Sequence, residues 1–238
     1  MVTQSVNLFS RVRHYLNLSR EFQSHLLIKP NDWLLFQTDF NSAVEKITSD
    51  ILLFEKENIK RSESRLYRLK RIFEQRYRRY FLYGVFPRWV FEKPFGYAGD
   101  FKIIDDIYQN QSRSIGFDRL WDDYFLQMVA AKSTRKRKDD FKEFICDFVG
   151  KRPGEDVRIM SLASGPAREI KELLDSDSHR LFGSTIFDCY DFETRAINYA
   201  QQLLNSAKNV NFFHKNAVRL ALTKDISREI PQSYDFIY

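Results

Sequence analysis

The residues with the clearest chemical potential lie in the last third of the chain, where a turn of small residues follows an apolar segment. Residues 157–163 (VRIMSLA) are typical of a buried strand, and Gly165 lies in the SGPA turn that follows. Asp191 ends the next apolar segment, 26 residues after Gly165. A carboxylate there can accept two hydrogen bonds from ribose hydroxyls, beside a turn and helix N-terminus that form a ligand cradle. The spacing therefore predicts a nucleoside site at the carboxyl edge of a parallel sheet.

The same turn disfavours NAD and FAD as ligands. It contains one Gly, whereas a dinucleotide fingerprint uses three glycines to bring the backbone close to a pyrophosphate. S-adenosylmethionine (SAM) has no phosphate. Its site needs a carboxylate for the ribose, a small-residue turn for the methionine part and an apolar slot for the adenine. The sequence supplies all three, so SAM is the expected cofactor.

Strands and helices are predicted to alternate around this turn. The strands are expected at residues 157–163, 185–190, 210–213 and 234–238, and the helices at 168–174 and 193–206. Such alternation is typical of βαβ units and a parallel sheet, which places the chain in the α/β class. The GKRPG segment at 150–154 predicts a boundary between a helical domain, residues 1–150, and a sheet domain, residues 151–238.

The helical domain holds the whole formal net charge of +6. Its densest basic segments are residues 60–79 and residues 132–138 (KSTRKRK). In the first, apolar and aromatic residues from Leu66 to Tyr80 recur at helical spacing, so we expect a packed stripe under a solvated basic face. An alternative function follows from these helices, a non-catalytic module that contacts an acidic protein or, less favoured, a nucleic acid.

Several function classes receive no support from the sequence. The longest apolar stretches fall far short of the roughly 20 residues that cross a bilayer, and the N-terminus lacks the pattern of a secretory signal. We therefore expect a cytoplasmic protein without a membrane span. Cys146 and Cys189 are far apart, and the four His residues show no metal-ligand spacing, so no metal site is expected.

Four segments resemble the class I SAM-dependent methyltransferases. VRIMSLASGPAREI resembles their motif I, FDCYDFETRAINYAQQLL their second strand and helix, VNFFHKNAVRL their third strand, and YDFIY the start of their fourth. The resemblance implies a Rossmann-like sheet that binds SAM. It departs from the family at Ala163 and Ala167, where many members carry Gly. The residues implied to bind SAM are Ala163, Ser164 and Gly165 at the methionine part, Asp191 at the ribose, Phe192 at the adenine face, and Asn216 and Ala217 at the adenine edge.

Two upstream segments extend the resemblance to residues 85–238. KPFGYAGDFKIIDDIY and AAKSTRKRKDDF are similar to the leader of a bacterial methyltransferase subgroup that includes the 3-hydroxy fatty acid methyl ester synthases. For Tyr97, Gly99 and Asp100 this implies a lid over SAM or the acceptor. The competing interpretation is a tight turn whose Asp caps the following helix.

The expected reaction is methyl transfer to a small-molecule acceptor, such as a carboxylate or hydroxyl oxygen. Because this is an in-line displacement, the protein mainly aligns the reacting atoms and excludes water. A carboxylate acceptor needs positively charged side chains that bind it, and the candidates are Arg88, Lys93 and Arg135. A hydroxyl acceptor needs a general base, and the spacing identifies no such catalytic residue.

The last apolar run, residues 234–238, corresponds to the fourth strand of a fold that continues through three more strands. The resemblance therefore implies the first half of a sheet with an open edge. We expect a second copy or another chain to pair with that edge, since exposed strand edges are normally covered.

Overall fold

The computed structural model describes residues 2–60, 62–97, 99–176 and 181–238. Its contacts divide the chain into two units, and each is described by itself. The helical unit comprises Met1–Pro94 and Gln111–Met128, and the sheet unit comprises Phe95–Asn110 and Val129–Tyr238. Each unit consists of two separate segments of the chain, and the segments of the two units alternate along the sequence.

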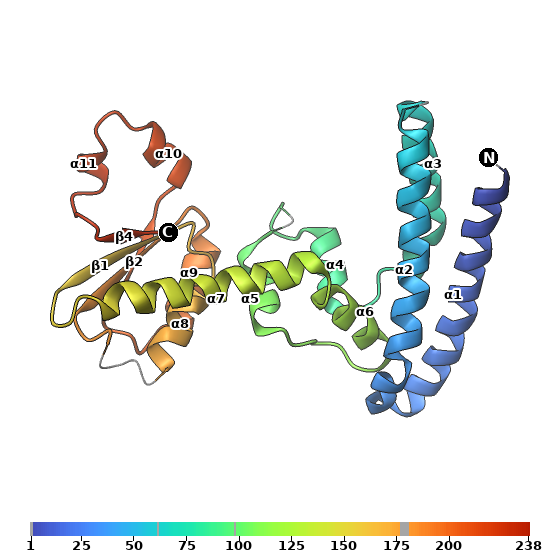
Figure 1. The fold of residues 1–238 in the computed structure, drawn as a ribbon, viewed down its shortest axis with the longest axis horizontal. Coiled ribbons are helices and arrows are strands. Elements are labelled where there is room, and N and C mark those ends of the chain that lie inside the picture. The colour runs from blue at the N-terminus through green and yellow to red at the C-terminus, as the bar shows by residue number, and fades with distance from the viewer. Residues whose placement is uncertain (1, 61, 98, 177–180) are drawn as a thin grey trace. The chain divides into compact units, whose positions relative to one another are not determined.

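The helical unit is built on two long helices, α1 (Val2–Ile28) and α2 (Trp33–Asn58), which lie side by side (Figure 1). Its core is aromatic: Tyr15, Phe40 and Trp121 are buried, with the Phe40 and Trp121 ring centroids 5.1 Å apart. Edge-to-face ring pairs of this kind stabilise a helical core beyond their area burial. The remaining elements are η1 (Pro30–Asp32), α3 (Glu63–Tyr77), η2 (Arg78–Tyr80), α4 (Val85–Glu92) and α6 (Gly116–Leu126).

The sheet unit contains four parallel strands in the order β3-β2-β1-β4. They are β1 (Val157–Leu162), β2 (Thr185–Asp191), β3 (Val210–His214) and β4 (Phe236–Ile237). In register, Val157 pairs with Thr185 and Leu162 with Tyr190, while β4 pairs with β1 at Ile159 and Met160. The predicted α/β class with a parallel sheet is confirmed, and so is a separate helical region.

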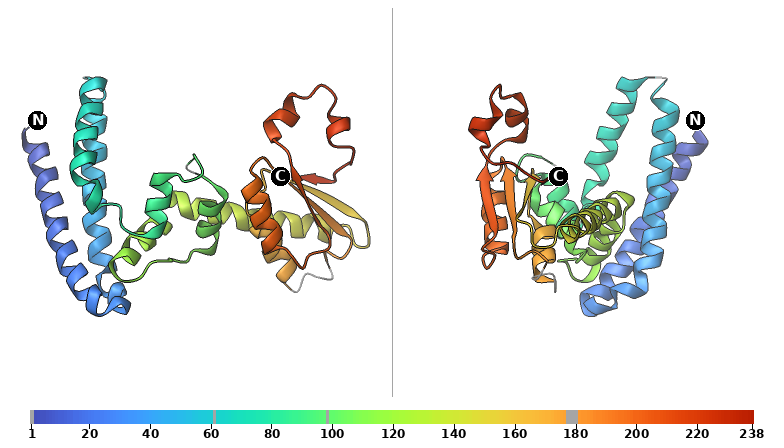
Figure 2. Two further views of the ribbon diagram at one scale, coloured as in Figure 1. Left: turned by 180° about the vertical axis from the view of Figure 1, so that it is seen from behind. Right: turned by 60° about the vertical axis from the view of Figure 1, so that its left-hand side comes forward.

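Helices cover the two faces of this sheet differently. Alternate strand residues such as Ile159 and Phe187 pack under α7 (Val129–Gly150), α8 (Arg168–Asp175) and α9 (Thr194–Leu203). The opposite face, with Met160 and Tyr190, packs against Leu220 of α10 (Ala217–Leu222) and Ile230, which follows α11 (Ile226–Glu229). Figure 2 shows the α10–α11 segment projecting from the strands. The unit's further helix is α5 (Phe101–Gln109).

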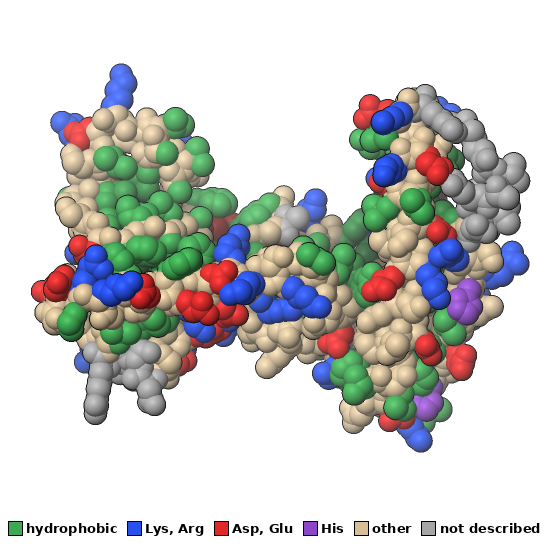
Figure 3. Space-filling view, viewed as in Figure 1, with side chains coloured by type: hydrophobic (Ala, Val, Ile, Leu, Met, Phe, Trp, Pro, Cys, Tyr) green, Lys and Arg blue, Asp and Glu red, His purple; other side chains and the backbone are tan. Residues whose placement is uncertain are grey.

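The division between the units does not fall at the GKRPG segment. Ile145 and Val149 of α7 lie in the core under β1, because the apolar side of this helix needs the sheet for its burial. Figure 3 shows basic and acidic side chains next to one another over α7. The sheet unit therefore includes α5 and α7, which the sequence analysis assigned to the helical domain.

Some predicted element boundaries differ from the structure. The helix predicted at residues 193–206 is shorter in the structure, where α9 spans Thr194–Leu203. The fourth strand spans only Phe236–Ile237, and α10 and α11 were not predicted. Across the described ranges, no helix is long and apolar enough to cross a membrane.

Candidate functional site

The turn after β1 contains three residues in the left-handed backbone region. Ala163, Gly165 and Ala167 have φ angles of 54°, 54° and 49°. This conformation is free of penalty for Gly but costs an alanine roughly 1 kcal/mol or more. Both alanines, which the sequence analysis noted as departures from the resemblance, thus lie where the backbone favours Gly. At Ala167 the strain is held by burial, since this residue is fully buried and its N–H donates to the Ser164 carbonyl.

Asp191 links this turn to the carboxyl end of β2. One carboxylate oxygen accepts a hydrogen bond from the Gly165 N–H at 2.8 Å, and the other accepts from the Glu193 N–H at 2.9 Å. The Asp191 residue is 6% exposed. Each oxygen has used one of its acceptor positions, so the carboxylate can still receive donors from a ligand. The structure thus brings Gly165 and Asp191 together, as their spacing predicted.

Backbone hydrogen bonds extend this connection across three strands. The Ser164 N–H donates to the Tyr190 carbonyl at 3.0 Å, and the Lys215 N–H donates to the Asp191 carbonyl at 2.9 Å. The residues that follow β1, β2 and β3 are therefore fixed to one another at the carboxyl edge of the sheet. Ligands of open α/β sheets bind at this edge.

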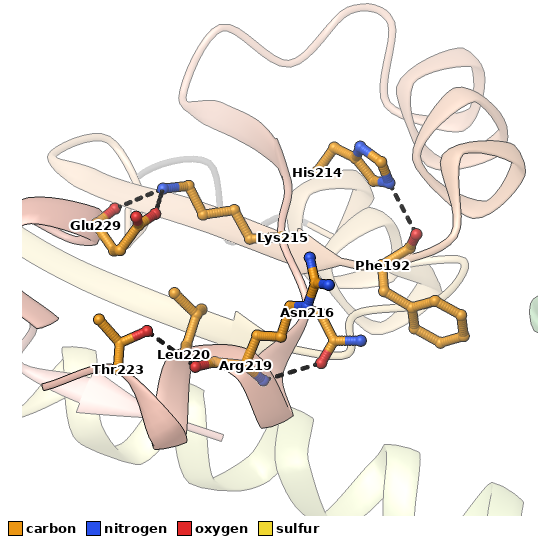
Figure 4. A pocket seen from close by; sticks show the side chains of 8 residues that line it. All are labelled: Phe192, His214, Lys215, Asn216, Arg219, Leu220, Thr223 and Glu229. Atoms are coloured by element: carbon orange, nitrogen blue, oxygen red, sulfur yellow. Dashed lines mark hydrogen bonds and ion pairs between the residues drawn. The ribbon is translucent and has the colours of Figure 1, made fainter.

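A pocket of about 500 Å³ lies between Phe192, which follows β2, and the helices α10 and α11 (Figure 4). Phe192 is half-exposed at its rim, and Asn216 caps α10 by accepting from the Arg219 N–H at 3.1 Å. Ala217 is the first residue of α10. The predicted residues Phe192 and Asn216 thus share one pocket. It is lined by Phe192, His214, Lys215, Asn216, Arg219, Leu220, Thr223 and Glu229.

The sequence analysis missed the polar side chains of this pocket. His214 hydrogen-bonds to the Phe192 carbonyl at 2.8 Å, and Lys215 pairs with Glu229 at 2.5 Å. Lys215 and Glu229 are 14 residues apart in the chain. The signal that could have identified them is the position of His214 and Lys215 directly at the end of β3, by the same rule that identified Asp191.

The segment around Tyr97 reaches the same edge of the sheet. The Tyr97 ring lies 6.2 Å from the Phe192 ring, and burial, with Glu193 and Asp191 nearby, raises the pKa of its hydroxyl. Asp100 is buried and accepts hydrogen bonds from the N–H groups of Lys102 and Ile103, so it caps α5. The structure therefore supports the cap interpretation for Asp100 and places Tyr97 at the site. Gly99 has open space where a side chain would extend.

The three candidate cations do not gather in one unit. Arg88 belongs to the helical unit, where it pairs with Asp118 at 3.4 Å. Lys93, also in that unit, ends α4 with a φ of 49°. Arg135 lies on α7 of the sheet unit, and burial lowers the pKa of its guanidinium.

The described residues contain no group of three or more His, Cys, Asp or Glu side chains arranged to hold a metal ion. The polar groups at the carboxyl edge are the Asp191 carboxylate at the end of β2, the Asn216 side chain that caps α10, and the ion pair of Lys215 with Glu229 at the pocket. This set can bind hydroxyl and amino groups next to an aromatic ring.

Comparisons with known proteins do not assign a family. No protein-family model matches the chain, and no curated protein matches it. Among solved structures, the chain is similar to a possible exported protein from Bordetella parapertussis, with 18% sequence identity and a TM-score of 0.41. The match covers 51% of this chain and 39% of that one, so the chain spans well under two thirds of its length. A similarity at this level carries no functional argument.

Proposed function

We propose that the sheet unit is the Rossmann-like SAM-binding part of a class I methyltransferase. The observation that carries the proposal is the Asp191 carboxylate, which accepts the Gly165 N–H at the carboxyl edge and directly precedes Phe192, an exposed aromatic residue that lines a pocket. The sequence resemblance and this geometry point to the same residues. The strand order β3-β2-β1-β4 also supports it, because the turn after β1 then lies beside the ends of both β2 and β4.

The charge at the turn favours a cationic or neutral ligand over a phosphate. In dinucleotide sites the backbone N–H groups of the turn face a pyrophosphate. Here the Gly165 N–H already faces the Asp191 carboxylate. The nearby Glu193 is paired with Arg195 at 2.8 Å, so the charge at the turn is that of Asp191. A phosphate would meet like charge, whereas the sulfonium and ammonium groups of SAM would meet opposite charge.

The residues present fit the parts of SAM. Asp191 would accept the ribose hydroxyls, Phe192 would contact the adenine face, and Asn216 with Ala217 would border its edge. The turn at Ala163, Ser164 and Gly165 would lie at the methionine part. A pocket of about 500 Å³ is within the usual range for such ligands. SAM supplies an electrophilic methyl group, and the chain's own residues bind, orient and exclude water.

The proposed acceptor is a small molecule that is methylated at a carboxylate or hydroxyl oxygen. A carboxylate acceptor needs no general base, which agrees with a site whose residues are acceptors and caps. Alignment of the reacting atoms is then the main contribution of the protein to the rate. Tyr97, beside Phe192, is placed to exclude water from the bound ligand.

The test is calorimetric titration of the folded chain with S-adenosylhomocysteine. We expect Asp191→Ala to weaken binding by about 1–3 kcal/mol, because two ribose hydroxyls lose a charged acceptor. Asp235→Ala is the matched control, since Asp235 also accepts a backbone N–H, that of Arg158 at 2.8 Å, but before β4 begins. ADP should bind more weakly than S-adenosylhomocysteine. Tight ADP binding, or equal affinity in the Asp191 variant, would contradict the proposal.

A second candidate function rests on α3 of the helical unit. Arg68 and Arg71 are exposed, and no ion pair is found for either within the described ranges. Unpaired cations on a helix favour contact with a polyanion, which is the binding-module alternative. The discriminating experiment measures how the binding of a polyanion depends on salt concentration.

A further inference from the structure

Asp105 of α5 is fully buried and accepts hydrogen bonds from three side chains. Arg168 contacts both of its carboxylate oxygens, the Tyr199 hydroxyl donates to it at 2.5 Å, and Gln109 donates at 2.6 Å. Buried charges persist only when they are paired and hydrogen-bonded, and this one is both. Asp105 lies in the KPFGYAGDFKIIDDIY segment, but the proposed function assigns it no role.

The partners of Asp105 come from the helices that follow the two loops of the site. Arg168 is the first residue of α8, directly after the turn that contains Gly165. Tyr199 lies on α9, which begins just after Asp191 and Phe192. Asp105 itself lies one helical turn after Phe101, the first residue of α5. One carboxylate thus joins three helices that start at the same edge of the sheet.

The start of α5 is in contact with the site through its rings. A Cβ added to Gly165 would lie 4.0 Å from the Phe101 Cβ, and the Phe101 ring lies 5.4 Å from the Tyr199 ring. Phe101 also stacks on Phe95 at 5.3 Å. The position of α5 therefore determines where the residues before it, Phe95 and Tyr97, meet the sheet unit's carboxyl edge.

Two further contacts fix those residues on the α9 side. The Arg195 guanidinium lies 4.0 Å from the centre of the Phe95 ring, and the Tyr97 ring lies 6.2 Å from the Phe192 ring. Both are weak contacts, worth about 1 kcal/mol each or less at exposed positions. They can order Tyr97 only if α5 already has a fixed position against α8 and α9. The hydrogen bonds of Asp105 to Arg168 and Tyr199 fix that position.

We propose that Asp105 is a positioning residue of the SAM site, which fixes α5 against α8 and α9 so that Tyr97 covers the ligand beside Phe192. The inference rests on the proposed function, since it concerns the same site. Asp105 acts through Arg168 and Tyr199 and does not itself touch the ligand.

The experiment uses Tyr199→Phe, which removes one donor to Asp105 and leaves the ring and the Asp105–Arg168 pair in place. Tyr234→Phe is the matched control, because the Tyr234 hydroxyl also donates to a buried aspartate, Asp188, at 2.8 Å on the other face of the sheet. Both variants lose one hydrogen bond to a buried carboxylate, and Tyr234→Phe also loses the bond with the Tyr190 hydroxyl at 2.9 Å. Tyr234→Phe should therefore lower the melting temperature at least as much, so a binding defect found only in Tyr199→Phe cannot come from lost stability.

We expect Tyr199→Phe to raise the Kd for S-adenosylhomocysteine about threefold to tenfold, the usual range for a residue that couples to a site without touching the ligand. Ligand-dependent hydrogen-exchange protection of peptides carrying Phe95 and Tyr97 should fall with it. Tyr234→Phe should keep the wild-type Kd and protection. If the wild-type chain binds S-adenosylhomocysteine but Tyr199→Phe matches it in both readouts, the role of Asp105 is refuted. If the wild-type chain itself does not bind, the proposed function fails first.

Discussion

The two basic segments of the chain, residues 60–79 and 132–138, look alike in sequence but differ in where their cations lie. In the sheet unit, the segment at 132–138 belongs to α7 and meets acidic groups of its own unit. In the helical unit, the segment at 60–79 spans α3 and η2 and meets mostly aromatic rings or solvent. A dense basic run therefore does not by itself predict an anionic partner.

Lys138 shows how the α7 segment is neutralised. Its ammonium group is buried and lies 2.6 Å and 2.8 Å from the two carboxylate oxygens of Glu172 on α8. Lys142, one turn later, binds the same carboxylate at 2.6 Å. Lys136 pairs with Asp140 on the same helix. The acid that matters most comes from another helix, so sequence spacing could not have revealed it.

On α3 and η2 the cations have different neighbours. The Arg78 guanidinium lies 3.9 Å from the centre of the Phe91 ring, and that of Arg79 lies 4.7 Å from the Tyr80 ring. Lys70 pairs with Glu55 of α2 at 2.8 Å. Cation–π contacts leave the positive charge uncompensated, whereas ion pairs cancel it. The helical unit thus keeps the electrostatic potential that the α7 segment loses.

The largest effect that this comparison predicts is on Lys138→Met. Removing one partner of a buried ion pair costs about 3 kcal/mol, although Lys142 still contacts Glu172. We expect urea unfolding to show a loss of about that size. Lys136→Met is the control, because its exposed pair with Asp140 should add nothing measurable. Equal unfolding curves for wild type and Lys138→Met would show that the α7 segment is no better neutralised than α3.

The pH dependence of the stability lost in Lys138→Met follows from the ionisation of Glu172. Burial alone would raise the pKa of its carboxyl, but hydrogen bonds from Lys138 and Lys142 outweigh burial and lower it below the ordinary 4.5. An acid with a lowered folded-state pKa stabilises the fold above its unfolded-state pKa, and that stability disappears as the pH falls through the folded value. The difference between wild type and Lys138→Met should therefore shrink below about pH 4. Denaturant midpoints from pH 3 to pH 7 measure it.

The sequence predicted the features that repeat locally and missed those that depend on other elements. The strands at β1, β2 and β3, the turn at Gly165 and the position of Asp191 follow from apolar periodicity and from where strands end. The membership of α7 in the sheet unit does not, because it depends on Ile145 and Val149 packing under β1. The ion-pair partners of Asp105 and Lys138 are also non-local. Arg168 is 63 residues from Asp105 in the chain, and Glu172 is 34 residues from Lys138.

The next effect is smaller and concerns the Arg78–Phe91 contact. We expect Arg78→Gln to destabilise the helical unit by about 0.5–1 kcal/mol, the range for an exposed cation–π pair. Phe91→Leu completes a double-mutant cycle, which isolates the pair term from the loss of the ring. Arg78→Lys, which keeps the charge, should retain part of the coupling. A coupling energy of zero would show that the contact with Phe91 adds no stability, so that Arg78 behaves like the unpaired arginines of α3.

The smallest effect on stability should come from Arg68→Gln with Arg71→Gln. Both side chains are exposed, and the described structure shows no ion pair for either, so the free energy of unfolding should change by less than about 0.5 kcal/mol. Their function is tested by fluorescence anisotropy with labelled poly-uridine and with poly-glutamate at two salt concentrations. A wild-type complex that weakens steeply with salt and is lost in the double variant would establish the binding-module function.

Titration with S-adenosylhomocysteine on the same double variant separates the two functions. Because Arg68 and Arg71 lie in the helical unit and the proposed SAM site uses residues of the sheet unit, we expect the Kd for S-adenosylhomocysteine to equal that of wild type. Lys136→Gln with Lys142→Gln is the matched pair on α7, where Asp140 and Glu172 already compensate the charge. If the α7 pair reduced polyanion binding as much as the α3 pair, neutralisation by Glu172 and Asp140 would not distinguish the two segments, and the basic run alone would suffice to attract an anion.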